Sequence, residues 1–212
     1  MSDRFELVLG TNNAAKGREL RELLDPHGFH IQTLADLPDA IDVVEDGDTF
    51  AANARKKAVE QALHLNAWVL ADDSGIEVQA LDGRPGVYSA RYAGPDATDA
   101  DNNALLLQEL GDRPPEKRAA RYVCHITLSD PQGQIRAEAH GECRGRIRLE
   151  PVGRNGFGYD PLFEVLEYHR TFGELGSHVK RAISHRARAV RGVVGQLIAL
   201  AERGEWTVPA AK

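Results

Sequence analysis

The strongest constraint on the fold of this chain is the repeated succession of a short apolar run and an amphipathic helical segment. Residues 5–9 (FELVL) form such a run, which ends at Gly10, and residues 14–24 then follow the pattern of a helix. Residues 29–33 are a second candidate strand. This order predicts an α/β fold with a mixed central sheet that is flanked by helices, together with a smaller lobe.

The remainder of the chain continues the alternation. The further predicted elements are a helix over 49–65 with Asp48 as its N-cap, a strand over 67–71, an ordered loop over 83–95, a helix over 99–110, a hairpin of strands 121–129 and 134–143, a glycine-rich loop over 153–161 and a final amphipathic helix over 183–201. No linker is long enough to separate two autonomous domains. We therefore expect one domain over residues 1–212, with two lobes and a substrate cleft between them.

The composition is that of a globular protein, and it narrows the choice of partners. Of the 212 residues, 42% are hydrophobic and 27% are charged, and the net charge is −6. A mildly acidic chain is a poor candidate for a general nucleic-acid binder, because such proteins usually carry a basic surface. No apolar run approaches the roughly 18–20 residues of a membrane helix. We expect neither a nucleic acid nor a membrane as a partner.

The N-terminal sequence and the small number of cysteines both favour a cytoplasmic protein. The sequence MSDRFELVLG at the N-terminus has no apolar stretch of the kind found in signal peptides. The two cysteines, Cys124 and Cys143, are too few for a disulfide framework or a zinc cluster. We expect a cytoplasmic protein with reduced thiols.

Candidate phosphate-binding residues lie between the first predicted strand and the first helix. They are Thr11, Asn12, Asn13, Ala14, Ala15 and Lys16. The free N–H groups of a helix N-terminus bind phosphate well, and Lys16 adds a positive charge. The alternative interpretation is that Thr11 or Asn13 only caps the helix and that Lys16 is a solvated charge.

A polar stripe on the next predicted helix forms a second candidate. Thr49, Asn53 and Lys57 are spaced by four and share one helix face, and Glu45 precedes them. A stripe of this composition can bind an anion. An ordinary solvated face has the same pattern.

The paired acids Asp72 and Asp73 are the most informative motif. They follow an apolar run and precede Ser74 and Gly75. Two adjacent carboxylates at the end of a buried strand need a compensating charge, and oxygen ligands of this kind suit Mg²⁺. Asp73 could position or deprotonate a water molecule, and Ser74 could bind a phosphate. The alternative is a turn that Asp and Gly terminate.

Two further segments carry groups that could bind a purine. In the first, Phe157, Gly158, Tyr159 and Asp160 offer two rings and a hydrogen-bond acceptor, although a turn with two core aromatics has the same composition. In the second, the donors are Lys180, His185 and Arg186, with Arg91 as a lesser candidate; the alternative is a helix cap followed by surface charge. Together with the acids and the lysines, these groups fit a nucleoside triphosphate with Mg²⁺.

Six blocks of the sequence, in order, resemble the inosine/xanthosine triphosphate pyrophosphatase family. The blocks are Thr11-x-Asn13-x-x-Lys16, Glu45-x-x-x-Thr49-Phe50-x-x-Asn53-Ala54, Ala71-Asp72-Asp73-Ser74-Gly75, Gly86 to Tyr92, Gly156 to Pro161 and Ser184-His185-Arg186. They span nearly the whole chain. One departure is Asn12, which stands where the family often has glycine.

The resemblance implies a homodimeric, Mg²⁺-dependent enzyme that hydrolyses XTP, ITP and dITP to the monophosphate and pyrophosphate. By the same resemblance, Asp73 is the general base, and Glu45, Asp72 and Asp73 hold the metal. The implied phosphate ligands are Thr11, Asn13, Lys16, Lys57 and Ser74. The implied ligands of the base and sugar are Phe157, Gly158, Tyr159, Asp160, Lys180, His185 and Arg186.

Two other functions remain compatible with the sequence. One is a regulator that binds a nucleotide without hydrolysing it, although a pure binder has less use for the acids at 72 and 73. The other is a hydrolase for a different nucleotide, such as a modified pyrimidine.

Overall fold

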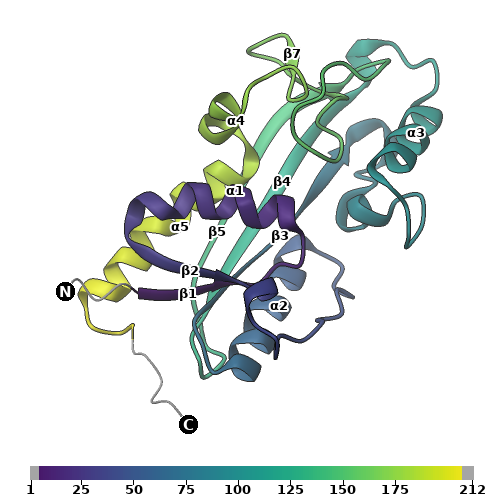
Figure 1. The fold of residues 1–212 in the computed structure, drawn as a ribbon. Helices are drawn as coiled ribbons and strands as arrows, with labels where there is room; N and C mark the ends of the chain where they lie inside the picture. The colour runs from purple at the N-terminus through teal and green to yellow at the C-terminus, as the bar shows by residue number, and fades with distance from the viewer. Residues whose placement is uncertain (1–4, 207–212) are drawn as a thin grey trace. The chain divides into compact units, whose positions relative to one another are not determined.

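A computed structural model describes residues 5–206, and its strands form one sheet in the order β2-β1-β3-β4-β5-β6-β7 (Figure 1). The strands are β1 (Phe5–Leu9), β2 (Phe29–Thr33), β3 (Val69–Val78), β4 (Ala119–Ser129), β5 (Ile135–Ile147), β6 (Phe163–Val165) and β7 (Arg170–Thr171). Strand β1 is parallel to β2 and β3, whereas β6 is antiparallel to β5 and β7. The sheet is mixed, as the sequence predicts.

Except for α4 (Ser177–Ile183), which is not predicted, the helices lie close to their predicted positions. They are α1 (Ala14–Leu24), α2 (Phe50–Leu65), α3 (Asp99–Leu110), α4 (Ser177–Ile183) and α5 (His185–Glu202). The predicted loop over residues 83–95 contains a 3₁₀ turn, Gly86–Arg91. Between residues 5 and 206, no helix combines the length and the apolar character needed to span a membrane.

Side-chain caps fix the starts of three helices. Asn13 caps α1 and Thr49 caps α2. The prediction of Asp48 as the α2 cap is wrong by one residue, because it is the Thr49 hydroxyl that accepts a free N–H of the first turn. At α3, Thr98 and Asp101 form a capping box, in which each side chain accepts from the other's backbone N–H.

The chain divides into two compact units. The first unit comprises Met1–Asp73, His125–Gly141 and Arg186–Lys212, and the second comprises Ser74–Cys124 and Glu142–His185. The boundaries fall within β3, β4 and β5 and at the start of α5. A single domain with a cleft between two lobes stays a prediction.

In the first unit, helices cover both faces of the sheet. Arg55 of α2 forms an ion pair with Glu138 of β5, with 2.7 Å between Nε and Oε1. A Cβ at Gly192 of α5 would lie 3.1 Å from the side chain of Ala139. Successive strand residues point to opposite faces, so α2 and α5 lie on opposite sides of β5.

An aromatic cluster closes the first unit near the end of the described chain. The ring of Trp206 stacks on Trp68 with centroids 4.4 Å apart, and it lies within 6 Å of Phe5 and Phe29. The indole N–H of Trp206 also donates to the carbonyl of Glu6, at 3.2 Å. These contacts tie the segment after α5 to β1 and β2.

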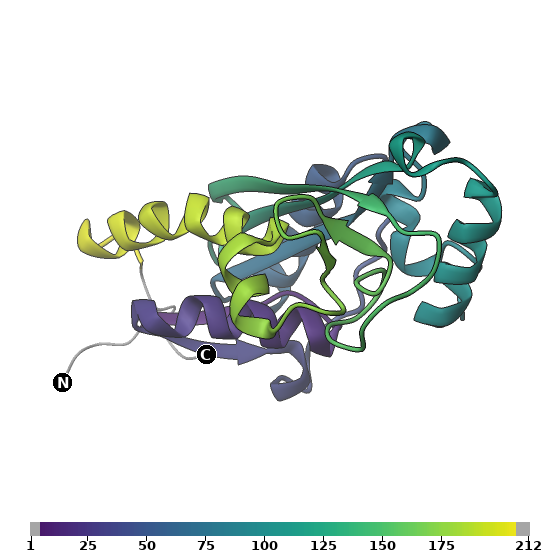
Figure 2. The same cartoon turned by 90° about the horizontal axis from the view of Figure 1, so that it is seen from above.

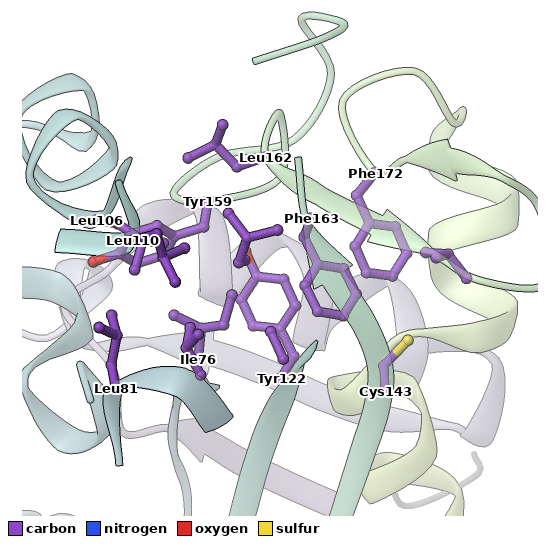
Figure 3. Close-up of a cluster of buried hydrophobic side chains, with 14 of the residues drawn as sticks. Ile76, Leu81, Leu106, Leu110, Tyr122, Cys143, Tyr159, Leu162, Phe163 and Phe172 are labelled. Atoms are coloured by element: carbon purple, nitrogen blue, oxygen red, sulfur yellow. The ribbon is translucent and has the colours of Figure 1, made fainter. Parts of the chain in front are cut away.

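The second unit has its own core (Figure 3). Phe163 lies at its centre, with ring centroids 4.6 Å from Tyr122 and 5.6 Å from Phe172. Leu106 and Leu110 of α3 are fully buried in the same cluster. Helix α3 also lies against the 3₁₀ turn that precedes it (Figure 2), since the Asn102 side chain donates to the carbonyl of Ala90.

Strand β3 is longer than the sequence predicts. We expect a strand over 67–71 with the two acids at its end, and a turn at the acids is the alternative; the strand instead runs from Val69 to Val78 and contains both Asp72 and Asp73. Apolar Ile76 and Val78 extend the buried run beyond the acids, and cations from other elements compensate the carboxylates.

Gly75 lies within β3 at a close approach to the 3₁₀ turn. A Cβ at this position would come within 2.3 Å of Ser89 Oγ and 2.6 Å of the carbonyl oxygen of Gly86. The Ser89 hydroxyl in turn accepts from the N–H of Ile76 at 2.9 Å. The glycine of the Asp-Asp-Ser-Gly motif therefore leaves space for a neighbouring backbone.

The final predicted helix, over 183–201, corresponds to α5, which begins two residues later, at His185. The short helix α4 before it, which ends at Ile183, is not predicted. Ser184 between them has an extended backbone, with ψ at 159°. The predicted apolar face is retained on α5, where Ala187, Val190 and Leu197 are buried.

Replacing Gly75 with alanine is expected to lower the free energy of unfolding by about 1–3 kcal/mol, because the added methyl group overpacks the contact with Gly86 and Ser89. Urea denaturation followed by circular dichroism measures the change. The matched control is Gly176→Ala, which meets no atom within 4 Å and is expected to change the free energy by less than about 0.5 kcal/mol. Equal stabilities of the two variants would contradict the argument.

Candidate functional site

The loop between β1 and α1 is organised by its own side chains. Asn13 Oδ1 accepts from the N–H groups of Ala15 and Lys16, each at 3.0 Å, and Thr11 Oγ1 accepts from the N–H of Asn13 at 3.2 Å. The capping role that was one of the two interpretations is therefore observed for Asn13. The Asn12 side chain, in contrast, donates to Asp42 Oδ1 at 3.2 Å on the surface.

One side of this loop lines a cavity of about 410 Å³. The loop residues in its wall are Thr11, Asn12, Asn13 and Ala14. The opposite wall comes from the segment after β2, including Leu34 and Ile41. Lys16 is not part of this wall, and its ammonium group is directed at the acids of β3 instead.

The two acids of β3 lie beyond the end of β1. The β1–β3 ladder ends at the pair Leu9–Leu70, and the N–H of Gly10 donates to the carbonyl of Leu70 at 2.8 Å. Asp72 and Asp73 follow immediately after Ala71. They therefore lie beyond the carboxyl end of a parallel strand, where ligands gather in open α/β sheets.

Asp72 is a fully buried charge of the first unit. Its side chain is 0% exposed, and its Oδ2 lies 3.2 Å from Arg186 Nε and 4.0 Å from Lys16 Nζ. Burial alone would raise the pKa of Asp72, but Lys16, Arg186 and Lys57 outweigh burial and hold this pKa well below its usual range. The carboxylate therefore stays ionised.

The neighbouring Asp73 responds in the opposite direction. Burial raises the pKa of its carboxyl group and Glu45 adds to the rise, while Lys16 and Lys57 act against both. Its Oδ1 lies 3.9 Å from each of the two lysine ammonium groups. A carboxylate with a raised pKa is the stronger proton acceptor of the pair.

The polar stripe of α2 faces these acids. Asn53 Nδ2 donates to Asp73 Oδ2 at 3.1 Å, and Lys57 Nζ donates to Glu45 Oε2 at 2.8 Å. The stripe is not a solvated face at these two positions, because Asn53 and Lys57 are buried. Burial lowers the pKa of Lys57, but Asp73, Asp72 and Glu45 together raise it above its usual value, so its ammonium group stays charged.

In the second unit, the loop at residues 157–160 contacts Lys180. Asp160 Oδ2 accepts from the N–H of Phe157 at 2.9 Å and from Lys180 Nζ at 2.5 Å. The same ammonium group lies 4.5 Å from the centroid of the Phe157 ring. Tyr159 is buried in the core shown in Figure 3, and its hydroxyl donates to the carbonyl of Ser89 at 2.8 Å. For Tyr159, the alternative of a core aromatic is observed.

His185 is held by a stacked ring. The imidazole lies parallel to the Tyr122 ring, with centroids 4.6 Å apart, and Tyr122 donates to Asp160 Oδ1 at 3.3 Å. Of the other predicted residues in this unit, Ser74 is half-buried on β3, and the Arg91 guanidinium lies 5.3 Å from the centroid of the Tyr88 ring.

With this geometry established, comparison with known proteins identifies the family. The sequence pattern of the Ham1 family matches residues 7–196. The chain belongs to the Ham1 family. The resemblance to inosine/xanthosine triphosphate pyrophosphatases is confirmed by curated relatives named "dITP/XTP pyrophosphatase". The relative from Rhodopirellula baltica is 56% identical over 95% of this chain and 97% of its own, and that from Geobacter sulfurreducens is 50% identical over 87% and 92%.

Solved structures of Ham1 proteins share the fold. The Ham1 protein of Staphylococcus aureus matches with a TM-score of 0.80 and 38% identity, over 93% of this chain and 99% of its own. The dITP/XTP pyrophosphatase of Mycobacterium abscessus matches with a TM-score of 0.72 and 40% identity, over 88% and 97%. The predicted fold class is therefore confirmed.

Arg186 has a different environment from the one that the Ham1 resemblance suggests. The resemblance implies that it reads the base, but its guanidinium group is 1% exposed and is bonded to Asp72 and Glu19 in the first unit. The Arg186 guanidinium group lies there because its positive charge compensates the carboxylates of Asp72 and Glu19. His185, the residue before it, belongs to the second unit.

Sequence reasoning missed two residues of these clusters. Glu19 follows Lys16 by three positions, a spacing that places both on one face of α1, and this signal could have been used. Tyr122 lies in a strand 38 residues before Asp160 and 63 before His185, so no local pattern connects them.

Asp72→Asn is expected to lower the free energy of unfolding by about 3 kcal/mol at neutral pH, because it leaves the buried Arg186 without its carboxylate at β3. The lowered pKa of Asp72 means that its folded form binds fewer protons than its unfolded form below about pH 4. The stabilisation is therefore complete above that pH and decreases as the pH falls.

Urea denaturation between neutral pH and the lowest pH at which the protein folds measures this difference. The matched control is Asp48→Asn, which changes an exposed carboxylate of the same unit. A deficit of Asp72→Asn that stays constant or grows in acid would contradict the assigned charge balance.

Proposed function

We propose that this Ham1 protein is a nucleoside triphosphate pyrophosphatase that hydrolyses dITP, XTP and ITP to the monophosphate and pyrophosphate, and so removes deaminated purines from the nucleotide pool. The observation that carries the proposal is the 56% identity, over 95% of the chain, to a protein named dITP/XTP pyrophosphatase. The cluster of Asp72, Asp73, Lys16 and Lys57 is proposed to supply the chemistry that this reaction needs.

The first unit is proposed to bind the triphosphate. The ammonium groups of Lys16 and Lys57 lie within 4 Å of Asp72 and Asp73, respectively. The lysines can bind phosphates while the carboxylates bind the metal that accompanies them. Thr11 and Asn13 shape the loop at the start of α1. Ser74, the residue after Asp73, is a further proposed phosphate ligand.

Magnesium is the proposed cofactor, held by Glu45, Asp72 and Asp73. Between residues 5 and 206, no three His, Cys, Asp or Glu side chains are gathered into a ready-made metal site. Mg²⁺ usually keeps several waters and binds through one or two carboxylates plus substrate phosphates. Carboxylates arranged around the ammonium group of Lys57 fit this mode, in which the substrate completes the coordination.

The proposed reaction is attack of water on the α-phosphorus with pyrophosphate as the leaving group. Asp73 aligns the water and accepts its proton, a role that suits the raised pKa of its carboxyl group. Lys16 and Lys57 stabilise the negative charge that develops on the phosphates. When bound by the carboxylates, Mg²⁺ would add to this charge compensation.

The second unit is proposed to bind the base. Phe157, Gly158, Tyr159, Asp160, Lys180 and His185 are the proposed ligands, with Arg91 as a further candidate, and Arg186 supports the acids rather than the base. A donor directed at the 6-oxo group of a purine meets an amino group in adenine and loses its partner. This mismatch is the proposed basis of discrimination against ATP.

A homodimer in the cytoplasm, with neither nucleic acid nor membrane as partner, completes the proposal. The dimer rests on the family resemblance. The proposed cytoplasmic location rests on the small number of cysteines in the sequence, Cys124 and Cys143.

The purified protein is expected to release pyrophosphate from dITP in the presence of Mg²⁺ and to lose this activity when the metal is chelated. A panel of XTP, dITP, GTP, ATP and dUTP, compared by kcat/KM, tests the base assignment. Nucleotide binding without pyrophosphate release would favour a regulator. If dUTP were the best substrate, the base assignment would be wrong.

Asp73→Asn is expected to lower kcat by at least about 10²-fold, because the amide cannot accept the proton of the water. The steady-state release of pyrophosphate from dITP measures the effect, and circular dichroism verifies the fold. The control Asp48→Asn should retain wild-type activity. Unchanged activity of Asp73→Asn would remove Asp73 from the mechanism.

A further inference from the structure

Two side chains of α3 hold both backbone polar groups of Gly158. The N–H of Gly158 donates to Asp99 Oδ2 at 2.7 Å, and Asn103 Nδ2 donates to the carbonyl of Gly158 at 3.0 Å. All three residues belong to the second unit. Gly158 lies between the two aromatic residues of the 157–160 loop.

The two bonds act on different peptide planes. The N–H of Gly158 belongs to the plane shared with Phe157, and its carbonyl belongs to the plane shared with Tyr159. Fixing both planes fixes the two backbone dihedrals of Gly158 itself, where φ is +61°. Glycine has wide conformational freedom in this region, so the backbone alone does not select this geometry.

Helix α3 provides a rigid support for this pair. Asp99 and Asn103 are four residues apart and share one face of the helix. The capping box of Thr98 and Asp101 fixes the first turn. Asn102 anchors the same turn to the preceding segment, because its Oδ1 accepts from the N–H of Ala93 at 2.8 Å.

The orientation of the Asn103 amide indicates that the bond to Gly158 is favoured over others. Among the described residues, its Oδ1 is buried and has no hydrogen-bond partner. Such an atom carries a desolvation penalty. The Asn103 side chain therefore has the orientation in which Nδ2 donates to the carbonyl of Gly158, although Oδ1 is then left without a hydrogen bond.

We propose that Asp99 and Asn103 are positioning residues for base recognition, and that they act by fixing Gly158 so that Phe157 and Asp160 keep the geometry in which they meet Lys180. This inference rests on the proposed function. It assigns to α3, which contains none of the proposed ligands, control over the affinity for the nucleoside part of the substrate. Binding of the phosphates is independent of the pair.

Kinetics with dITP test the proposal. Asp99→Ala and Asn103→Ala are each expected to raise KM about five- to tenfold, while kcat changes less than about twofold, because the loop must be ordered anew for each binding event. Inhibition by tripolyphosphate, which has no base, is measured in parallel. Its inhibition constant is expected to stay within about twofold of the wild-type value.

Two conservative variants sharpen the result. Asp99→Asn keeps an acceptor for the N–H of Gly158 and is expected to restore a KM near that of the wild type. Asp112→Asn removes an exposed carboxylate just after α3 and should have no effect. A KM for Asp99→Asn as high as that of Asp99→Ala would overturn the proposed bond, and this variant serves even if the alanine variants fail to fold.

Hydrogen exchange of the Gly158 amide gives a direct readout. Protection of this amide is expected in the wild type and in Asp99→Asn, and its loss in Asp99→Ala. Unchanged KM values, or a parallel rise in the tripolyphosphate constant, would overturn the inference. A wild-type protein that releases no pyrophosphate from dITP would instead contradict the proposed function, so the two failures are distinguishable.

Discussion

The buried carboxylate of Asp72 is the constraint on which the first unit depends. A charge removed from water must be compensated nearby, and here the compensation comes from α1, α2 and α5 through Lys16, Lys57 and Arg186. Each cation is in turn balanced by another acid, as Glu45 does for Lys57. The requirement for charge balance therefore brings three helices to one point of β3.

The same cluster gives two adjacent aspartates different properties. Asp72 is held ionised by surrounding cations, whereas burial and the nearby Glu45 raise the pKa of Asp73. The two carboxylates share Lys16, but Asp72 also lies 3.2 Å from Arg186 Nε, whereas Asp73 accepts from Asn53 Nδ2. One carboxylate is suited to a permanent electrostatic role, and the other is suited to accepting a proton.

Local patterns in the sequence were sufficient for the elements that local interactions determine. The bounds of α1 and α3 follow from their caps and apolar spacing, and the hairpin of β4 and β5 follows from its turn at residues 130–133. The full length of β3 could not be predicted, because two adjacent acids normally mark the end of a buried strand. The cations that compensate them come from distant parts of the sequence. Arg186 is 114 residues from Asp72 and 167 from Glu19, so its position is a tertiary effect.

The stacking of Trp68 and Trp206 has a practical consequence. These are the only two tryptophans of the chain, and both belong to the first unit. Selective excitation of indole therefore reports on that unit alone, and the close parallel rings favour excitonic coupling that disappears when the segment after α5 detaches. The protein thus contains an intrinsic optical probe of one unit, while the tyrosines and phenylalanines of the other remain silent at those wavelengths.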